Sequence, residues 1–220
     1  MREILVLGTG AVAAELESYF EDNNRVIADE RDKFYVKGYI EYAHNIENYW
    51  KKYELKAPVL GDIDSYDFQP GAEVFIAIAN VDFKTNLIEK LDQKGVRFPN
   101  FIHHSAIVAS SAELGRGNII YPHVIVGPKV KMKDFNLVTS YSFISHDCII
   151  GSMNFLSTAG LAGKVEVGDN NFFGIRSTVI PSVHIGSGNT IQAGMTVDKD
   201  VADNTTVFYR FKEKVLVLPK

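Results

Sequence analysis

The sequence predicts two structural units in one chain, a small parallel α/β domain followed by an all-β parallel solenoid. The second half repeats an apolar residue every six positions. The first half instead alternates short apolar runs with helical patterns and carries a glycine turn near its start. The chain has 220 residues, 46% of them hydrophobic, which is enough to bury two small cores.

The first predicted strand covers the apolar run 4–7, and the turn Gly8-Thr9-Gly10 follows it directly. A helical pattern then continues to Phe20. A glycine turn that opens a helix places backbone N–H groups and the positive end of the helix dipole where a phosphate can bind. Gly8 and Gly10 are therefore candidate substrate-binding residues. The pattern is also compatible with glycines that only permit a tight turn.

Two further apolar runs predict strands over 25–28 and 74–79. Asp29 ends the first of these strands, about twenty residues after the glycine turn, where a partner for a ribose or a base is expected. Asn80 follows the next strand and is a second candidate for contact with the substrate. Both assignments depend on the predicted strand ends.

An aromatic stripe predicts a helical insertion near 35–56, because its members are spaced alternately by three and four residues: Tyr39, Tyr42, Ala43, Ile46, Tyr49, Trp50 and Tyr53. We expect this helix to pack on the sheet as core, or alternatively to offer an aromatic platform to a substrate base. After the strand over 74–79, a further helix is expected, capped by Asp82 and ended by Gly95.

The solenoid is predicted from the repeat of six. Strand side chains alternate with period two, so a strict period of six requires short strands joined by regular corners. One rung cannot bury its apolar residue alone, and successive coils must therefore stack. The repeated apolar positions are Ile120, Val126, Met132, Val138, Ile144, Ile150 and Leu156, then Val167, Phe173, Val179, Ile185, Ile191 and Val197. Most are followed, four residues later, by a compact residue: Val124, Val130, Asn136, Ser142, Cys148, Asn154, Asn171, Ser177, Val183 and Asn189.

Three hexapeptides make one triangular coil, so about five coils fit between Ile107 and Val201. The step from Ile107 to Leu114 is irregular, and Leu156 and Val167 are eleven residues apart where twelve are expected. One residue is thus missing from that coil. We expect a first domain over 1–102, the solenoid over 103–204 and a tail over 205–220.

Composition excludes several classes of partner. The net charge is −4 with no basic stripe, which argues against nucleic acid and anionic membranes. The lone Cys148 falls on a compact inward position, where a thiol fills space. The apolar run 4–7 is too short for a signal peptide or a membrane span, and we expect a cytoplasmic protein.

Several motifs carry a family resemblance: Pro58-Val59-Leu60-Gly61, Phe75-Ile76-Ala77-Ile78-Ala79-Asn80, Phe101-Ile102-His103-His104-Ser105-Ala106, Ile144-Ser145-His146-Asp147-Cys148-Ile149-Ile150-Gly151, Phe173-Gly174-Ile175 and Val179-Ile180-Pro181. With the glycine turn, they resemble the hexapeptide sugar O-acyltransferases, which include sialic acid O-acetyltransferases and N-acetyltransferases of nucleotide-linked 4-amino sugars such as bacillosamine and perosamine precursors. The resemblance implies a homotrimer. It also implies a Rossmann-like domain for the nucleotide sugar and a left-handed parallel β-helix for acyl-CoA.

His146 is the candidate catalytic base. It stands two residues after Ile144, so its side chain is predicted to point out of the solenoid, and imidazole suits proton removal near neutral pH. It matches the family's His-Asp or His-Glu pair, which makes Asp147 the partner that orients the ring or stabilises the imidazolium. An exposed surface histidine without a role is the alternative.

The resemblance also places acyl-CoA in a groove between adjacent solenoids, where small residues let the pantetheine approach the backbone. The matching positions are Ala162, Gly163, Gly174, Ile175, Ala193 and Gly194. Backbone N–H groups near Ala162 and Gly163 are candidates for the oxyanion. Thr139 replaces an asparagine that contacts the acceptor in the amino-sugar enzymes. The glycines are alternatively explained by tight corners.

We expect no metal. The trimeric β-helix hydratases that bind zinc have two histidines five residues apart, and no such pair occurs in this sequence. His103 and His104 are expected to form a structural cap at the domain junction. The glycine turn has Ala11-Val12 where the family carries Gly-His, which leaves the identity of the sugar open.

The sequence thus predicts transfer of an acetyl group from acetyl-CoA to an amine, or else a hydroxyl, of a nucleotide-activated sugar. His146 would act directly, without a covalent enzyme intermediate. The alternatives are a catalytically diverged trimer that only binds a nucleotide sugar, and an O-acetyltransferase of a sialic-acid-like sugar.

Overall fold

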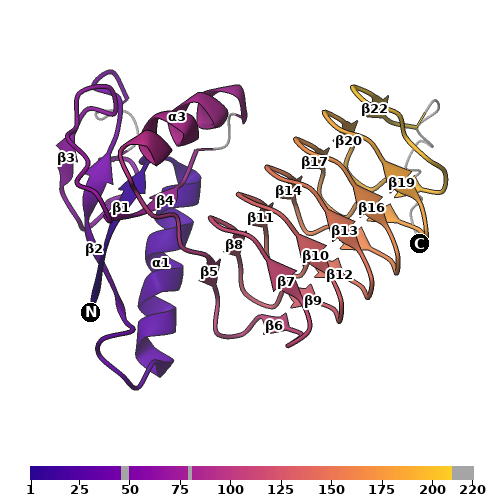
Figure 1. Ribbon diagram of the computed structural model, residues 1–220, viewed down its shortest axis with the longest axis horizontal. Coiled ribbons are helices and arrows are strands. Elements are labelled where there is room, and N and C mark those ends of the chain that lie inside the picture. The colour runs from indigo at the N-terminus through magenta and orange to yellow at the C-terminus, as the bar shows by residue number, and fades with distance from the viewer. Residues whose placement is uncertain (46–49, 79–80, 210–220) are drawn as a thin grey trace, which may run out of the picture.

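The computed structural model describes residues 1–220 except 46–49, 79–80 and 210–220. A small α/β domain lies at one end of a long β-solenoid, and the chain enters the solenoid from the α/β domain at β5 (Figure 1). Within the described ranges, no helix is both long enough and apolar enough to cross a membrane.

The α/β domain contains a four-stranded parallel sheet in the order β3-β2-β1-β4. Its elements are β1 (Arg2–Leu7), α1 (Ala11–Val26), β2 (Phe34–Ile40), β3 (Val59–Gly61), β4 (Glu73–Ile76) and α3 (Val81–Gln93). The order reverses between β1 and β4, and the carboxyl ends of these two strands are where ligands bind in open parallel sheets.

The predicted strand over 25–28 is wrong. Helix α1 continues to Val26, and the second strand begins only at Phe34. The buried face of α1 runs Ala13, Leu16, Phe20 and Asn23, so the helical period continues for one turn beyond Phe20. Asn23 hides this turn from hydropathy analysis because it is polar and yet buried. Its amide reaches Ile102 O, 3.0 Å away, in the neighbouring solenoid.

The predicted helix near 35–56 is also wrong wherever the structure describes that segment. Tyr39 lies fully buried in β2, and its hydroxyl donates to Glu17 Oε1 at 3.0 Å. Trp50 and Tyr53 lie in turns, where Trp50 Nε1 donates to Ala57 O at 2.9 Å. Most of these aromatic side chains pack against the core, from a strand and turns instead of from one helix face. Ile46 and Tyr49 lie outside the described residues.

Helix α3 starts at Val81, which places Asp82 inside the first turn instead of at the cap. Gly95 ends this helical segment as predicted. It adopts φ +70°, and its N–H donates to Asp92 O at 3.0 Å.

The solenoid has three parallel sheets. The seven-stranded sheet contains β5 (Phe101–Ile102), β8 (Ile119–Ile120), β11 (Leu137–Val138), β14 (Phe155–Leu156), β17 (Phe172–Phe173), β20 (Thr190–Ile191) and β22 (Thr206–Val207). The six-stranded sheet contains β6 (Ile107–Val108), β9 (Ile125–Val126), β12 (Phe143–Ile144), β15 (Gly160–Leu161), β18 (Thr178–Val179) and β21 (Thr196–Val197). The five-stranded sheet contains β7 (Glu113–Leu114), β10 (Lys131–Met132), β13 (Ile149–Ile150), β16 (Glu166–Val167) and β19 (His184–Ile185).

The repeat of six is confirmed, since every repeated apolar position from Ile120 to Val197 is buried, and so is every compact position. The missing residue falls in the corner between β14 and β15. As a result, Phe155 of β14 pairs with Phe172 of β17, which lies seventeen residues later in the chain instead of eighteen. The irregular step at Ile107 was a register error. Ile107 points outward with 65% exposure, and Val108 pairs with Val126 at the inward position.

Both predicted solenoid boundaries shift. Phe101–Ile102 already pairs with β8, and Thr206–Val207 still pairs with β20. The described solenoid therefore extends by two or three residues beyond each end of 103–204. With seven strands on its longest face, it also has more rungs than the five coils expected.

A column of buried asparagines, Asn118, Asn136, Asn154, Asn171 and Asn189, runs through the coils. The side-chain amide of Asn136 donates to Asn118 Oδ1 at 3.0 Å, and that of Asn154 donates to Asn136 Oδ1 at 3.1 Å. Each carbonyl oxygen from Asn118 to Asn171 also accepts the backbone N–H of the next asparagine in the column. The ladder satisfies buried corner groups and helps hold successive coils in register.

Candidate active site

His146 lies in the corner that joins β12 to β13, and its side chain is 55% exposed. Ile144 and Cys148 on either side are fully buried. The corner therefore turns the imidazole outward, which is the orientation that the register predicts.

The His146 ring has an orienting partner in its own corner. Nδ1 lies 2.8 Å from Asp147 Oδ2, and Asp147 adopts φ +59°, in the left-handed region. The hydrogen bond with His146 lowers the pKa of the Asp147 carboxyl, with smaller contributions from Lys129 and Lys164. An ionised carboxylate only accepts hydrogen bonds, so a neutral ring donates from Nδ1 and keeps the lone pair on Nε2. This is the arrangement that a general base requires.

The coils before and after His146 leave room for it through glycines. A Cβ on Gly163 would lie 2.6 Å from Cε1 and Nε2 of the imidazole, and one on Gly127 would lie 3.0 Å from the backbone N of His146. Gly127 allows close stacking of the backbone. Gly163 instead leaves space for the ring itself.

The predicted CoA residues fall into two groups on opposite edges of the six-stranded sheet. Ala162 and Gly163 follow β15, in the corner column of His146. The corners after β17 and β20 hold the other group: Gly174, Ile175, Ala193 and Gly194. One chain therefore does not bring the two groups together at a single edge.

Structural reasons account for some of these small residues. A Cβ on Gly174 would lie 2.6 Å from Ala193 N, which indicates close backbone stacking, and Gly194 adopts φ +72°. Thr139 lies in the same corner column as Gly174. Its hydroxyl donates to Leu156 O and accepts the Thr158 N–H, at 3.2 and 2.9 Å. The N–H of Ala162 donates to Val179 O at 3.0 Å, so it is not available to an oxyanion.

The glycine turn already holds an anionic group. Both the N–H and the hydroxyl of Thr9 donate to Glu41 Oε2, at 2.8 and 2.9 Å. Glu41 is 5% exposed and directly follows β2. Gly8 has φ +94°, and a Cβ there would lie 3.1 Å from Ala77 O, so tight packing against β4 also explains this glycine.

Asp29 does not end a strand, so the position predicted for it beside the glycine turn is wrong. It lies beyond the C-terminal end of α1, whose sixteen residues span about 24 Å, and it pairs with Arg31 at 2.6 Å. Glu41 is the acidic residue that follows the true second strand. The sequence pattern does not reveal Glu41, because the apolar run over 25–28 imitates a strand that the structure places at Phe34–Ile40. Asn80 lies outside the described residues.

Lys84 is a further residue that the sequence analysis missed. It helps to line a small cavity between the α/β domain and the solenoid, together with Val12 of α1 and Ile76 of β4. Burial lowers the pKa of Lys84 to about 8, and its ammonium donates to Phe135 O at 2.8 Å. A cation thus stands near the carboxyl ends of β1 and β4.

No family model matches the sequence. A GDP-perosamine N-acetyltransferase from Escherichia coli O157:H7 is 30% identical over 121 residues, which cover 54% of this chain and 49% of that enzyme. An acyl-[acyl-carrier-protein]–UDP-N-acetylglucosamine O-acyltransferase from Alkalilimnicola ehrlichii is 31% identical over 103 residues, 43% of this chain and 40% of that enzyme. The chain spans half or less of the length of these curated relatives.

Two solved structures match the whole fold. PerB from Caulobacter crescentus, in complex with CoA and GDP-perosamine, has a TM-score of 0.78 at 24% identity and covers 94% of this chain and 93% of its own. The acetyltransferase domain of PglB from Neisseria gonorrhoeae has a TM-score of 0.77 at 20% identity, with 94% and 96% covered. The matches confirm the predicted resemblance, because acetyltransferases for nucleotide-linked amino sugars are among them.

Proposed function

We propose that this chain transfers the acetyl group of acetyl-CoA to the amine of a nucleotide-linked amino sugar, with His146 as general base. The observation that carries the proposal is the pair of His146 Nδ1 and Asp147 Oδ2 at 2.8 Å in an outward corner. That pair leaves the lone pair of Nε2 available beside Gly163. The acetyltransferase relatives and the complete fold match support the choice of reaction.

The reaction needs one base and one oxyanion donor. The amine nitrogen attacks the thioester carbonyl carbon while Nε2 of His146 takes the amine proton. The tetrahedral intermediate then breaks its C–S bond, and the imidazolium returns the proton to the leaving sulfur. The negative oxygen requires a hydrogen-bond donor. The Gly163 N–H is the candidate that remains, because the Ala162 N–H donates to Val179 O.

A homotrimer is part of the proposal. The six-stranded sheet carries an outward apolar column of Ile107, Ile125 and Phe143, exposed by 65%, 47% and 44%. The equivalent positions of the five-stranded sheet are mostly polar. A second copy that covers the apolar column would bring its own residues next to the His146 corner. The two edges that hold the candidate CoA residues would then face each other from different subunits and form one groove.

The α/β domain is proposed to bind the nucleotide sugar in a Rossmann-like manner, and the solenoid to be left-handed. Strand order, the glycine turn and the Lys84 ammonium support the first assignment. Glu41 already occupies the Thr9 N–H and hydroxyl, which argues against phosphate binding at Thr9.

The test is release of CoA thiol by the full chain with acetyl-CoA and a panel of UDP-, dTDP- and GDP-linked amino sugars. His146→Ala should lower kcat by at least about a hundredfold without changing the melting temperature. His184→Ala is the matched control, because that side chain is 59% exposed and also faces a carboxylate, Glu166. Equal activity of the two variants would remove His146 as the base. No release with any acceptor would favour a binding protein.

A further inference from the structure

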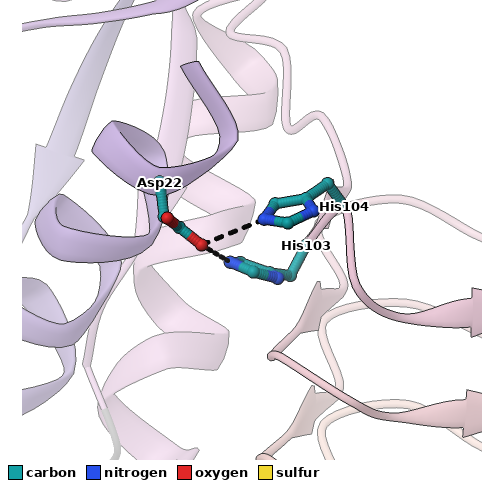
Figure 2. A group of neighbouring side chains, drawn as sticks. All are labelled: Asp22, His103 and His104. Atoms are coloured by element: carbon teal, nitrogen blue, oxygen red, sulfur yellow. Dashed lines mark hydrogen bonds and ion pairs between the residues drawn. The ribbon is translucent and has the colours of Figure 1, made fainter. Parts of the chain in front are cut away.

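Three potential metal ligands converge where α1 meets the first coil of the solenoid. Figure 2 shows Asp22, from the last part of α1, pointing toward the rings of His103 and His104. Asp22 Oδ2 lies 3.2 Å from His103 Nε2 and 3.0 Å from His104 Nε2. Across the part of the chain that the structure describes, this is the group of three such side chains whose ligand atoms lie within 4.8 Å of one another.

His103 and His104 are predicted from the sequence to form a structural cap. Hydrogen bonding to Asp22 does not fully account for the cluster. His103 is 3% exposed, and its Nε2 is buried without a hydrogen bond of acceptable geometry, although Asp22 is near. The contact with Asp22 is therefore an ion pair without good hydrogen-bond geometry, and it leaves this buried nitrogen poorly satisfied.

We propose that Asp22, His103 and His104 bind a zinc ion. Tetrahedral coordination at bond lengths near 2.0–2.1 Å separates neighbouring ligand atoms by about 3.3 Å, close to the observed distances from Asp22. Two imidazole nitrogens and one carboxylate oxygen form a donor set that zinc accepts. A water molecule would complete the coordination. The ion would satisfy the buried Nε2 of His103.

Neighbouring groups are suited to hold the ligands in place. Ser105 contacts His103 Nδ1 through both its Oγ, at 2.8 Å, and its backbone N–H, at 3.2 Å. Zinc at Nε2 requires the tautomer in which Nδ1 donates its proton to Ser105 Oγ. Asn23 fixes the backbone on both sides, because its amide donates to Ile102 O and its Oδ1 accepts the His104 N–H at 2.7 Å. The His104 side chain is 35% exposed, which leaves an entry path for the ion.

The consequence is a metal clamp between the two domains, separate from the His146 corner. Asp22 belongs to the α/β domain, whereas both histidines belong to the start of the solenoid. Zinc would therefore fix the angle between the domains and stabilise the folded chain by its binding free energy. Acetyl transfer would need no metal at its reacting atoms.

The experiment titrates metal-free full-length protein with Zn²⁺ and follows the melting temperature, with Co²⁺ absorption as a second readout of a four-coordinate site. Wild type should gain several degrees and bind Zn²⁺ at least tenfold more tightly than Asp22→Asn or His104→Ala. Asp22→Asn retains a hydrogen-bond acceptor, so it separates metal binding from hydrogen bonding. His184→Ala, which removes another exposed histidine beside a carboxylate, should behave as wild type.

Two results would overturn the site: no rise in melting temperature at saturating Zn²⁺, or the same rise in both ligand variants. Either one would leave a hydrogen-bonded ion pair. If Asp22→Asn fails to fold, His104→Ala still decides the matter, because its side chain lies partly in solvent and its loss leaves the core intact.

Discussion

A methyl group on Gly163 would lie 2.6 Å from both Cε1 and Nε2 of His146, which stands one coil earlier in the same corner. The absence of a side chain at Gly163 therefore leaves the space that the imidazole occupies. Because that ring is 55% exposed, it can move into solvent at little cost to the fold. A substitution at Gly163 should consequently disturb the position of the ring much more than the stability of the protein.

Gly163→Ala tests this relationship. We expect kcat to fall at least about tenfold, since displacement of a reacting group costs rate, while the melting temperature changes little. Gly168→Ala is the control, because a Cβ there would lie 2.9 Å from the Gly186 backbone, in another corner of the solenoid; it should lower stability and leave the activity of the folded molecule unchanged. Steady-state kinetics and thermal unfolding measure the two effects. A large loss of stability with full activity per folded molecule would contradict this account.

Asp147→Asn tests the orientation of the ring. Asparagine tolerates the positive φ of this corner, so the backbone should not change. It cannot supply the charge that stabilises the imidazolium, and we expect kcat to fall about tenfold because the pair is exposed. Glu166→Gln, which alters the carboxylate beside His184, should leave kcat unchanged. Unchanged activity of Asp147→Asn would show that the orienting group lies elsewhere.

The proposed trimer predicts opposite effects for two isoleucines of equal exposure. Ile125 and Ile149 are both 47% exposed, but they lie on different faces of the solenoid. Ile125→Asp should yield a folded, inactive monomer, because it places a charge in the apolar column. Ile149→Asp should remain assembled and active. Light scattering with size-exclusion chromatography distinguishes the species, and a monomeric wild type would end the proposal.

The asparagine ladder predicts a gradient of stability along the solenoid. Asn136→Ala removes the acceptor of the Asn154 N–H and one donor to Gly151 O, so the free energy of unfolding should fall by about 3 kcal/mol. Asn189→Ala should cost less, since its side-chain NH2 makes no hydrogen bond and only its Oδ1 does, accepting the Thr205 N–H at 2.6 Å. Urea denaturation of both variants gives the comparison. Equal losses would mean that the ladder adds nothing beyond backbone pairing.

Lys84 predicts a pH dependence. Burial lowers its pKa to about 8, below the value of about 10.4 expected in the unfolded chain. Between these values the unfolded chain binds more protons, so stability rises with pH. From about pH 7.5 to about pH 9.5, wild type should gain about 1 kcal/mol relative to Lys84→Met, after allowance for partial exposure. The free energy of unfolding is measured by urea denaturation at each pH. If it changes with pH equally in the two proteins, the Lys84 ammonium lies in solvent and the prediction is wrong.

The repeat could be predicted from sequence because each coil obeys a local rule. Residues six apart meet the same environment, so the inward positions from Ile120 to Val197 and the outward turn at His146 follow from register alone. The register error at Ile107 shows the limit of this local rule. Ile107 and Val108 are both apolar, so the sequence alone does not say which of them points inward. Pairing of Val108 with Val126, eighteen residues away, decided between them.

The α/β domain was predicted less well because polar residues occupy its interior. Buried Asn23 concealed the last turn of α1, and the second strand was then placed too early. That single error moved the expected acidic residue from Glu41 to Asp29. The hydrogen bond between Glu41 and Thr9 joins residues that are 32 positions apart, and no local pattern encodes it.

Local sequence pattern was enough to predict the solenoid, the inward residues of its coils and the outward position of His146, because a short period repeats the same packing problem in every coil. Tertiary structure alone decided which polar groups meet across the chain. It brought Asp22 to His103 and His104 from about eighty residues away, and it placed the candidate CoA residues on two edges of one sheet. The physical reason is that the orientation in which two domains pack depends on the shape and chemistry of both complete surfaces, which no local sequence pattern encodes.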